Sequence, residues 1–208
     1  MEDYSLFDQM DESYIICGAD EAGRGPLAGP VVAAAVILPQ DFPFEILGDS
    51  KKLTEKERLY AECIIKEKAI SYGITAVGHV VIDKINILNA SMLAMAESYK
   101  KASLKVKPDI LLVDGNKCPS VDIPVKAIVK GDSKIPEIMA ASILAKTERD
   151  RLMELADLKW PQYGYKKHKG YPTKMHYEAI GKYGPSPICR MSFKLYKTDN
   201  RKEEPGLL

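Results

Sequence analysis

The sequence has little of what marks several large classes of protein. Its four cysteines, at positions 17, 63, 118 and 189, form no C-x-x-C pair and lie near no histidine cluster. This spacing argues against a zinc site and is typical of reduced thiols. No run approaches the roughly 18 uninterrupted apolar residues of a membrane-spanning helix. The acidic first 13 residues also lack the basic start and apolar stretch of a signal peptide. We therefore expect a cytoplasmic protein with no membrane segment.

An excess of charge of one sign is also missing. The 30 lysines and arginines nearly balance the 29 acidic residues and leave a net charge of +1, so the total charge points to no class of partner. Hydrophobic residues make up 46% and charged residues 28% of the chain, close to the average of globular domains. That composition excludes a disordered or collagen-like chain. The 208 residues suit one globular domain without internal repeats.

Hydrophobic patterns and turn signals predict an α/β core followed by a helical C-terminal part. Strands are expected at 14–17, 31–38, 72–81, 109–113 and 125–129, and helices at 54–71, 86–103, 138–158 and 174–182. The first helix begins with the capping-box spacing of Thr54 and Glu57 and should bury Leu59, Cys63 and Ile70. We divide the chain into a flexible leader (1–13), a catalytic core (14–136), a helical part (137–196) and a flexible tail (197–208).

The segment GADEAGRGP, residues 18–26, combines acids and glycines after the first expected strand. Carboxylates such as Asp20 and Glu21 suit hard divalent cations, whereas a solvated acidic turn is the ordinary alternative for such a pair. Arg24 between two glycines suits contact with phosphate and sugar. The segment is neither a Walker A loop nor a dinucleotide-binding fingerprint. Because adjacent side chains on a regular strand face opposite ways, the two acids share a site only where the backbone bends.

Two further acids follow interior strands. Asp114 ends the run 109–113 and Asp132 follows the next strand, so the sheet can bring them to the end where Asp20 lies. Four carboxylates without His or Cys favour Mg²⁺ or Mn²⁺ over zinc and can hold two ions for phosphoryl transfer. Asp114 precedes a glycine, however, and suits a plain turn equally well. Asp150 is predicted to form an ion pair on a helix face, with Arg149 or Arg151, and not to bind metal.

The segment KWPQYGYKKHKGYPTK, residues 159–174, contains five lysines, three tyrosines and one tryptophan but no acid. Two interpretations stay open: a nucleic-acid contact surface, or a solvated basic loop with Trp160 buried. His168 and His176 are predicted to be contact or structural residues and not acid–base catalysts. Lys146, after a run of small helical residues, is a candidate phosphate contact.

Seven segments in order resemble the bacterial ribonuclease HII, or type 2 ribonuclease H, family over roughly 15–193. They are GADEAGRGPLAGPV (18–31), DSKKLTEKER (49–58), VDG (113–115), KGD (130–132), AASILAKTERD (140–150), HKGYPTKMH (168–176) and GPSPICRMSF (184–193). The resemblance implies an α/β ribonuclease H-like fold, with a five-stranded mixed sheet flanked by helices. It also implies a helical C-terminal subdomain that closes over the substrate.

By the same resemblance, the protein is a metal-dependent endoribonuclease using Mg²⁺ or Mn²⁺, with two ions. It would hydrolyse the RNA strand of RNA/DNA hybrids and nick 5′ to single ribonucleotides in duplex DNA, leaving 3′-hydroxyl and 5′-phosphate ends. The four catalytic, metal-binding acids would be Asp20, Glu21, Asp114 and Asp132. The substrate would be bound by Gly23, Arg24 and Gly25 at the 2′-hydroxyl, by Tyr171 stacking on the neighbouring sugar, and by Ser50, Lys51, Lys146 and Lys169 at phosphates.

Three alternatives compete with this interpretation. A type 3-like enzyme would need several ribonucleotides, and a hybrid-binding module without catalysis would lack the acids. A small-molecule phosphohydrolase would have little use for the basic segment at 166–174. The absence of an extra N-terminal domain, together with Arg24 where type 3 enzymes tend to have lysine, favours type 2. We expect a monomer with no obligate protein partner.

Overall fold

A mixed five-stranded sheet forms the centre of the protein. The computed structural model describes residues 14–48, 50 and 52–196; the predicted leader and tail lie outside this range. The strands are β1 (Ile16–Ala22), β2 (Val31–Ile37), β3 (Ser71–Val77), β4 (Ile110–Asp114) and β5 (Val125–Ile128), in the order β3-β2-β1-β4-β5. The first three strands pair antiparallel, while β4 is parallel to β1 and to β5. The predicted mixed sheet of five strands is confirmed.

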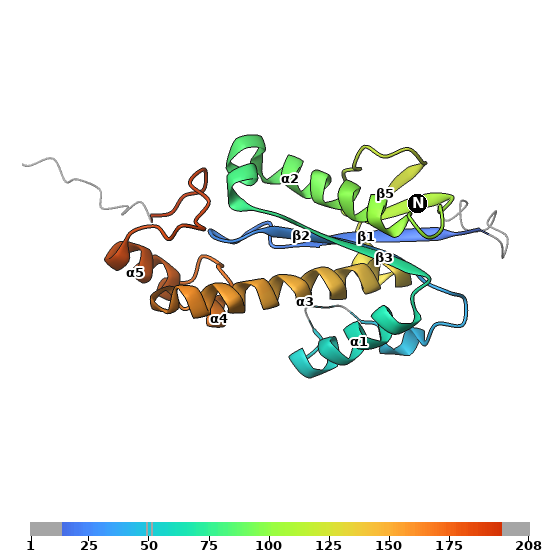
Figure 1. The fold of residues 1–208 in the computed structure, drawn as a ribbon, viewed down its shortest axis with the longest axis horizontal. Helices are drawn as coiled ribbons and strands as arrows, with labels where there is room; N and C mark the ends of the chain where they lie inside the picture. The colour runs from blue at the N-terminus through green and yellow to red at the C-terminus, as the bar shows by residue number, and fades with distance from the viewer. Residues whose placement is uncertain (1–13, 49, 51, 197–208) are drawn as a thin grey trace, which may run out of the picture.

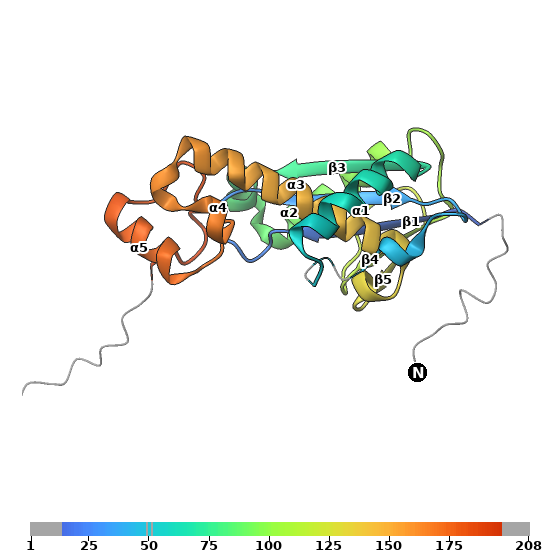
Figure 2. The same ribbon diagram turned by 90° about the horizontal axis from the view of Figure 1, so that it is seen from below.

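Helices cover both faces of this sheet. They are α1 (Glu55–Lys68), α2 (His79–Ala102), α3 (Pro136–Lys159), α4 (Tyr165–His168) and α5 (Lys174–Tyr183). Figure 1 shows α2 on one face and α3 on the other, with α1 outside α3. Seen from below in Figure 2, α1 lies alongside α3, while α4 and α5 gather at the far end of α3, beyond the strands. The C-terminal part thus continues from the helix that covers one sheet face.

The residues of β2 explain why this strand lies between two helical layers. All seven are buried, and six of them divide between two apolar clusters on opposite faces of the sheet. Val31, Ala33, Ala35 and Ile37 pack toward α2, while Ala34 and Val36 pack toward α3 and α1. A strand with apolar side chains on both faces is stable only where both faces are covered. Small residues let α3 approach closely: a Cβ at Gly18 would overlap the backbone of Glu137.

The largest differences from the predicted element boundaries lie at two places. The first strand runs to Ala22, so Asp20 and Glu21 lie inside it and not after it. The third strand ends at Val77, because residues 79–85 already form the first part of α2. At Asn86 the backbone leaves the helical region (φ 65°, ψ 166°), and the Asn86 Oδ1 accepts a hydrogen bond of 3.1 Å from Asn89 N–H. Asn86 therefore caps the second helical piece, which is why the predicted start lay there.

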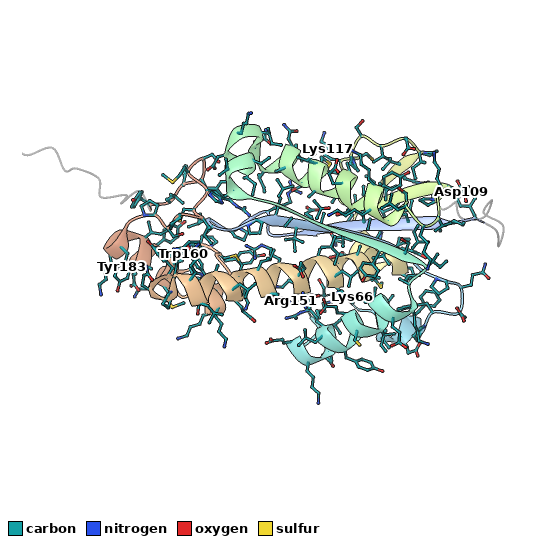
Figure 3. All side chains as sticks on the ribbon, in the orientation of Figure 1. Lys66, Asp109, Lys117, Arg151, Trp160 and Tyr183 are labelled. Carbon is teal, nitrogen blue, oxygen red and sulfur yellow. The ribbon has the colours of Figure 1, made fainter. Side chains whose placement is uncertain are left out.

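Helix α1 has the predicted capping box but buries a different face. The Thr54 side chain accepts from Glu57 N–H, and the Glu57 carboxylate accepts from Thr54 N–H. The predicted inward residues Leu59 and Cys63 are exposed, because α1 packs as an outer layer on α3 and needs only a narrow face of Ala61, Glu62 and Ile65. Glu62 is buried because it pairs with Lys66 and Arg151, which face each other across α1 and α3 in Figure 3.

Within the described ranges, no helix is both long and apolar enough to cross a membrane.

Candidate active site

Three aspartates from separate segments converge at one edge of the sheet. Asp20 lies near the end of β1, Asp114 ends β4, and Asp132 lies in a 3-10 turn, η3 (Gly131–Ser133), that follows β5. One carboxylate oxygen from each lies within 4.8 Å of the others. Because β1, β4 and β5 run parallel, their carboxyl ends meet at this edge. Asp20 and Asp132 are buried and Asp114 is half-buried. The predicted convergence of these three acids is therefore present in the structure.

Sheet register places two of the carboxylates side by side. Ala19 pairs with Val113 across β1 and β4, so the next residues, Asp20 and Asp114, follow at matching positions. Asp20 also pairs with Ala34, which packs on the α3 side of the sheet. The acidic cluster thus lies on the face that α3 covers.

The turn that carries Asp132 is fixed by Asp114. The Asp114 Oδ1 accepts hydrogen bonds from the backbone N–H groups of Gly131 (2.8 Å) and Asp132 (3.4 Å). Lys130, just before the turn, adopts the left-handed conformation (φ 58°), which is uncommon for a residue with a side chain. This strained residue and the two hydrogen bonds redirect the chain so that Asp132 returns toward β4.

Glu21, the fourth predicted acid, is not a member of the 4.8 Å cluster. It lies opposite Ala33, on the sheet face away from Asp20, as the alternation of a regular strand requires. Its carboxylate pairs with the Arg24 guanidinium at 3.2 Å. The Asp20 carboxylate in turn accepts a hydrogen bond of 2.6 Å from Glu21 N–H. Glu21 nevertheless lies close enough for its charge to raise the pKa of Asp20, and the charge of Asp114 raises the pKa of Glu21 in turn.

The acidic cluster is electrostatically suited to a cation. Burial, followed by the charge of Glu21, raises the pKa of Asp20 to about 8, while the charge of Asp114 adds to the rise and a hydrogen bond from Ser142 opposes it. Burial also raises the pKa of Glu21, against the lowering effect of Arg24. Crowded, buried carboxylates with oxygen-only ligands fit a hard divalent cation such as Mg²⁺ or Mn²⁺, whose charge would relieve this repulsion.

The glycine-rich loop after β1 lies against Tyr171. Gly23 has a φ of +97°, and a Cβ there would overlap the Arg149 side chain, so both conformation and space require glycine. A Cβ on Gly25 would lie 3.8 Å from the Tyr171 ring. Tyr171 is 40% exposed, and half of the Arg24 side chain is exposed. The structure thus brings the predicted recognition residues together beside the acidic edge.

Comparison with known proteins decides the family. A family model described as Ribonuclease HII matches residues 17–196. The chain belongs to the ribonuclease HII family. The ribonuclease HII of Dechloromonas aromatica (strain RCB) is 52% identical over 179 residues, which cover 86% of this chain and 90% of that relative. This member of the family is accordingly a ribonuclease H, a nuclease of the hydrolase class.

Solved structures agree with this assignment. The crystal structure of the ribonuclease H2 from Pyrococcus horikoshii OT3 superimposes with a TM-score of 0.72 at 26% identity, covering 87% of this chain and 94% of that one. The Bst-RNase HIII structure in complex with Mn²⁺ superimposes with a TM-score of 0.71 over 94% of this chain and 71% of that one. At 17% identity, the second likeness shows the shared fold alone. The predicted ribonuclease H-like fold is confirmed.

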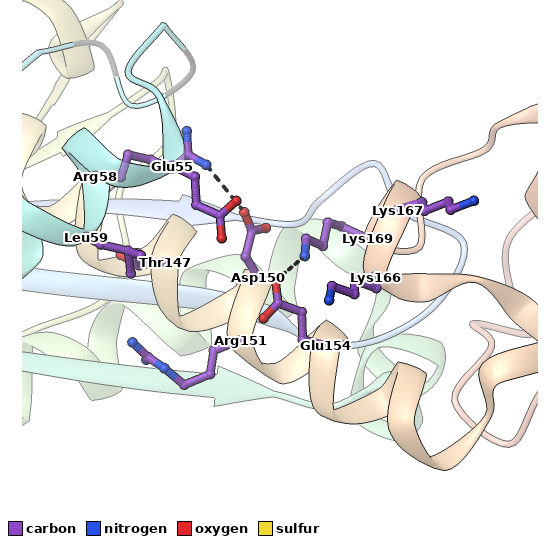
Figure 4. A pocket seen from close by; sticks show the side chains of 10 residues that line it. All are labelled: Glu55, Arg58, Leu59, Thr147, Asp150, Arg151, Glu154, Lys166, Lys167 and Lys169. Carbon is purple, nitrogen blue, oxygen red and sulfur yellow. Dashed lines mark hydrogen bonds and ion pairs between the residues drawn. The ribbon is translucent and has the colours of Figure 1, made fainter.

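Three of the four predicted phosphate contacts of this ribonuclease HII have other partners in the structure. Lys146 pairs with Asp150 at 2.6 Å, and Lys169 pairs with Glu154 at 2.6 Å. Ser50 is buried, with its Oγ 2.8 Å from that of Ser142. Lys51 lies outside the described residues. Figure 4 shows the groove of about 360 Å³ between α1, α3 and α4 into which Lys169 and Asp150 project. Five basic and three acidic residues line it, and Lys166, Lys167 and Lys169 lie together at the end formed by α4.

Asp150 forms an ion pair on a helix face, as predicted, but with other partners. It pairs with Lys146 one turn away and with Arg58 of α1 at 3.9 Å. Arg151 instead pairs with Glu62 and Glu148. Arg149 points inward and donates to backbone carbonyls. Spacing along α3 could not show this, because the partner helix and the inward face are set by packing.

The aromatic residues of the basic segment 159–174 mostly pack inside the C-terminal part. Tyr163 and Tyr165 are buried and stack at 5.6 Å. His168 and His176 are buried and stack at 4.5 Å, in agreement with their predicted structural role. Trp160 is only half-buried. Tyr171 is thus the aromatic residue of this segment that is free to meet a substrate, while Lys159, Lys166, Lys167 and Lys174 keep the surface basic.

Sequence reasoning missed three residues that shape this site. Ser142 forms hydrogen bonds with the Asp20 carboxylate and with Ser50. The sequence indicates only that Ser142 belongs to a run of small residues on α3. Arg149 and Arg190 are almost completely buried and lie behind the glycine-rich loop. Both arginines stand in segments that carried the family resemblance, so the signal was present, but a charged residue is ordinarily assigned to the surface.

Proposed function

We propose that this ribonuclease HII nicks duplex DNA 5′ to a single embedded ribonucleotide, cleaves the RNA strand of RNA/DNA hybrids, and needs Mg²⁺ or Mn²⁺. The supporting observation is a juxtaposition: Gly25 lies against the ring of Tyr171, and Gly23–Gly25 directly follow the strand that carries Asp20. A binding site for one sugar between Gly25 and Tyr171 would therefore adjoin the cluster of carboxylates. Its product ends would be a 3′-hydroxyl and a 5′-phosphate.

The cation would be held by Asp20, Asp114 and Asp132, whose oxygens already lie within 4.8 Å of one another. When bound, divalent cations activate a water for attack on phosphorus and stabilise the developing negative charge; two can act together. Glu21, whose charge already acts on Asp20, would join as a fourth ligand if Arg24 moved to a substrate phosphate and the Glu21 side chain turned toward the cluster. The Asp114 hydrogen bonds to the η3 turn keep Asp132 in position throughout.

Recognition would depend on the 2′-hydroxyl, which takes no part in the cleavage itself. Backbone groups of Gly23 and Gly25 can approach it closely because no side chain stands between them and the sugar. The exposed Tyr171 ring would stack on the neighbouring sugar. Lys146 and Lys169 would reach phosphates by leaving Asp150 and Glu154, with Ser50 and Lys51 completing the phosphate contacts. All of these residues come from one chain, so the proposal needs no second protein.

The test uses a DNA duplex with one ribonucleotide, incubated with the protein and Mg²⁺, Mn²⁺ or EDTA, and the cut is mapped to the nucleotide. We expect a metal-dependent nick immediately 5′ to the ribonucleotide. Cleavage within a uniform RNA/DNA hybrid, without any nick in the single-ribonucleotide duplex, would indicate type 3-like specificity. The acids would then keep their role, whereas the assignment of Gly23, Gly25 and Tyr171 would be overturned.

A further inference from the structure

Two buried arginines lie behind the recognition loop, and neither has a carboxylate within ion-pair distance among the described residues. Arg149 and Arg190 are 1% and 0% exposed, and neither forms an ion pair within the described part of the chain. Burial of a guanidinium without a counter-ion is costly unless its N–H groups find acceptors. Burial, together with the charge of Arg149, lowers the pKa of Arg190 to about 9. Because such an arrangement contributes little to stability, the presence of two buried arginines here needs a different explanation.

Backbone carbonyls of the recognition loop are the acceptors of Arg190. Its Nη2 donates to Gly23 O (2.6 Å), its Nη1 to Arg24 O (2.9 Å) and its Nε to Gly29 O (2.9 Å). The planar guanidinium presents its donors in a fixed geometry, so three bonds fix the loop more tightly than separate contacts would. Arg190 itself is anchored, because the next two backbone N–H groups donate to the Asp83 carboxylate on α2.

Arg149 contacts both halves of the recognition site. Its Nε donates to Pro30 O (3.1 Å), and its Nη2 donates to Lys169 O (2.9 Å), two residues before Tyr171. Its guanidinium carbon lies 5.6 Å from the centre of the Tyr171 ring, within cation–π range. It also fills the space where a side chain on Gly23 would lie. One side chain thus sets the separation between the glycine-rich loop and the tyrosine.

We propose that Arg149 is a positioning residue for recognition of a single ribonucleotide, holding Tyr171 and the Gly23–Gly25 loop at the separation that one sugar requires, with Arg190 fixing the loop from behind. This inference rests on the proposed function. A duplex with one ribonucleotide has a single productive register on the enzyme. A shift of either the Gly23–Gly25 loop or Tyr171 therefore lowers the rate of cleavage directly. A uniform hybrid presents a 2′-hydroxyl at every nucleotide, so its cleavage is less sensitive to such a shift. Misplacement by about 1 Å can cost on the order of a hundredfold in rate.

The test compares kcat and KM for the two substrates in Arg149→Met, which keeps the chain length but removes the donors, and in Arg149→Lys, which keeps the charge. Arg151→Met is the matched control, because it removes a neighbouring arginine of α3 that pairs with Glu62 and Glu148. We expect Arg149→Met to lower the ratio of kcat/KM on the single-ribonucleotide duplex to that on the hybrid by at least about tenfold. The substrate ratio of Arg149→Lys should lie between those of the wild type and Arg149→Met, and Arg151→Met should keep the wild-type ratio.

A double-mutant cycle separates positioning from a general loss of structure. In a Tyr171→Ala background, Arg149→Met should change the substrate ratio by no more than about twofold, because the separation that Arg149 sets matters only while the Tyr171 ring is present. Equal losses on both substrates, in proportion to lost thermal stability, would overturn the proposal. So would failure of both Arg149 variants to fold. If the wild type itself does not nick the single-ribonucleotide duplex, the proposed function fails, and this outcome is visible before any variant is measured.

Discussion

The Asp114 carboxylate accepts a hydrogen bond of 2.8 Å from the backbone N–H of Gly131. This contact joins the end of β4 to the turn after β5, so one aspartate both faces the cluster and sets the position of the next acid. Side-chain acceptors that satisfy backbone donors in turns are common. Here the sequence alternatives of turn residue and metal ligand are compatible, because the turn role uses one oxygen and the cluster can use the other.

Loss of one carboxylate from the cluster should abolish turnover. Asp20→Asn and Asp132→Asn keep the size of the side chain but remove the charge that holds a cation, so we expect single-turnover rates to fall by orders of magnitude. Duplex affinity, measured in EDTA by fluorescence anisotropy, should change little, since substrate contacts lie elsewhere. Asp157→Asn, on the outer end of α3, is a matched control. Near-normal turnover by either cluster variant would contradict the assignment of these aspartates as metal ligands.

The same charge removal should stabilise the protein without metal. Asp20 is buried beside other carboxylates, so a neutral amide there relieves repulsion, and Asp20→Asn should melt above the wild type in EDTA. Mg²⁺ or Mn²⁺ should raise the melting temperature of the wild type, because a ligand that binds only the folded state stabilises it. The variant should respond much less. Calorimetry with and without metal checks both; equal metal responses would contradict the assignment of Asp20 as a ligand.

Loss of the Tyr171 ring should affect cleavage more than folding. The side chain is 40% exposed and projects beside Gly25, so Tyr171→Ala removes little buried surface. We expect a clear fall in kcat/KM on the single-ribonucleotide duplex and a change in unfolding free energy of less than about 1 kcal/mol. Tyr171→Phe, which keeps the ring, should retain most activity. If Tyr171→Ala cleaves this duplex as well as the wild type, the ring takes no part in recognition.

The strands were largely predictable from sequence, while partners across the fold were not. Val31–Ile37 is apolar throughout and flanked by turn residues, which sufficed to identify a buried strand. Asp20, Asp114 and Asp132 lie within, at the end of and after such strands near one edge of the sheet, where parallel strand ends meet, so their convergence could be inferred. Nothing local indicates that Lys169 meets Glu154, because that contact depends on how α4 folds back on α3.

The inward arginines were missed for a related reason. A TERDR sequence on a helix ordinarily indicates a solvated face, and only the packing of α3 shows that Arg149 points at the loop carbonyls while Arg151 points outward. Glu21 illustrates the opposite case. Strand alternation set the condition that it shares a site with Asp20 only where the backbone bends, and its place opposite Ala33 in the register leaves its predicted role as a metal ligand a prediction.

The stacked pair His168 and His176 should make stability fall in mild acid. Burial lowers the pKa of both imidazoles below the ordinary 6.5. Their hydrogen bonds agree with neutral rings, because His168 Nδ1 accepts from Gly170 N–H and therefore carries no proton. His176 Nδ1 donates to Tyr171 O at 3.0 Å, and its Nε2 is buried with no partner among the described residues. A proton there would be an unsatisfied buried charge.

The sign of the effect follows from proton linkage. Below about pH 6.5 the unfolded chain binds protons at both histidines while the folded chain does not, so the free energy of unfolding decreases as pH falls through this range. Each histidine contributes a slope of up to about 1.4 kcal/mol per pH unit. Urea unfolding of the wild type and of His168→Gln between pH 7.5 and 5 measures this slope, with His79→Gln on α2 as control. A slope in His168→Gln equal to that of the wild type would show that the pair does not titrate as proposed.

Because both rings hold the backbone next to Tyr171, cleavage of the single-ribonucleotide duplex should fail over the same pH range before the protein unfolds.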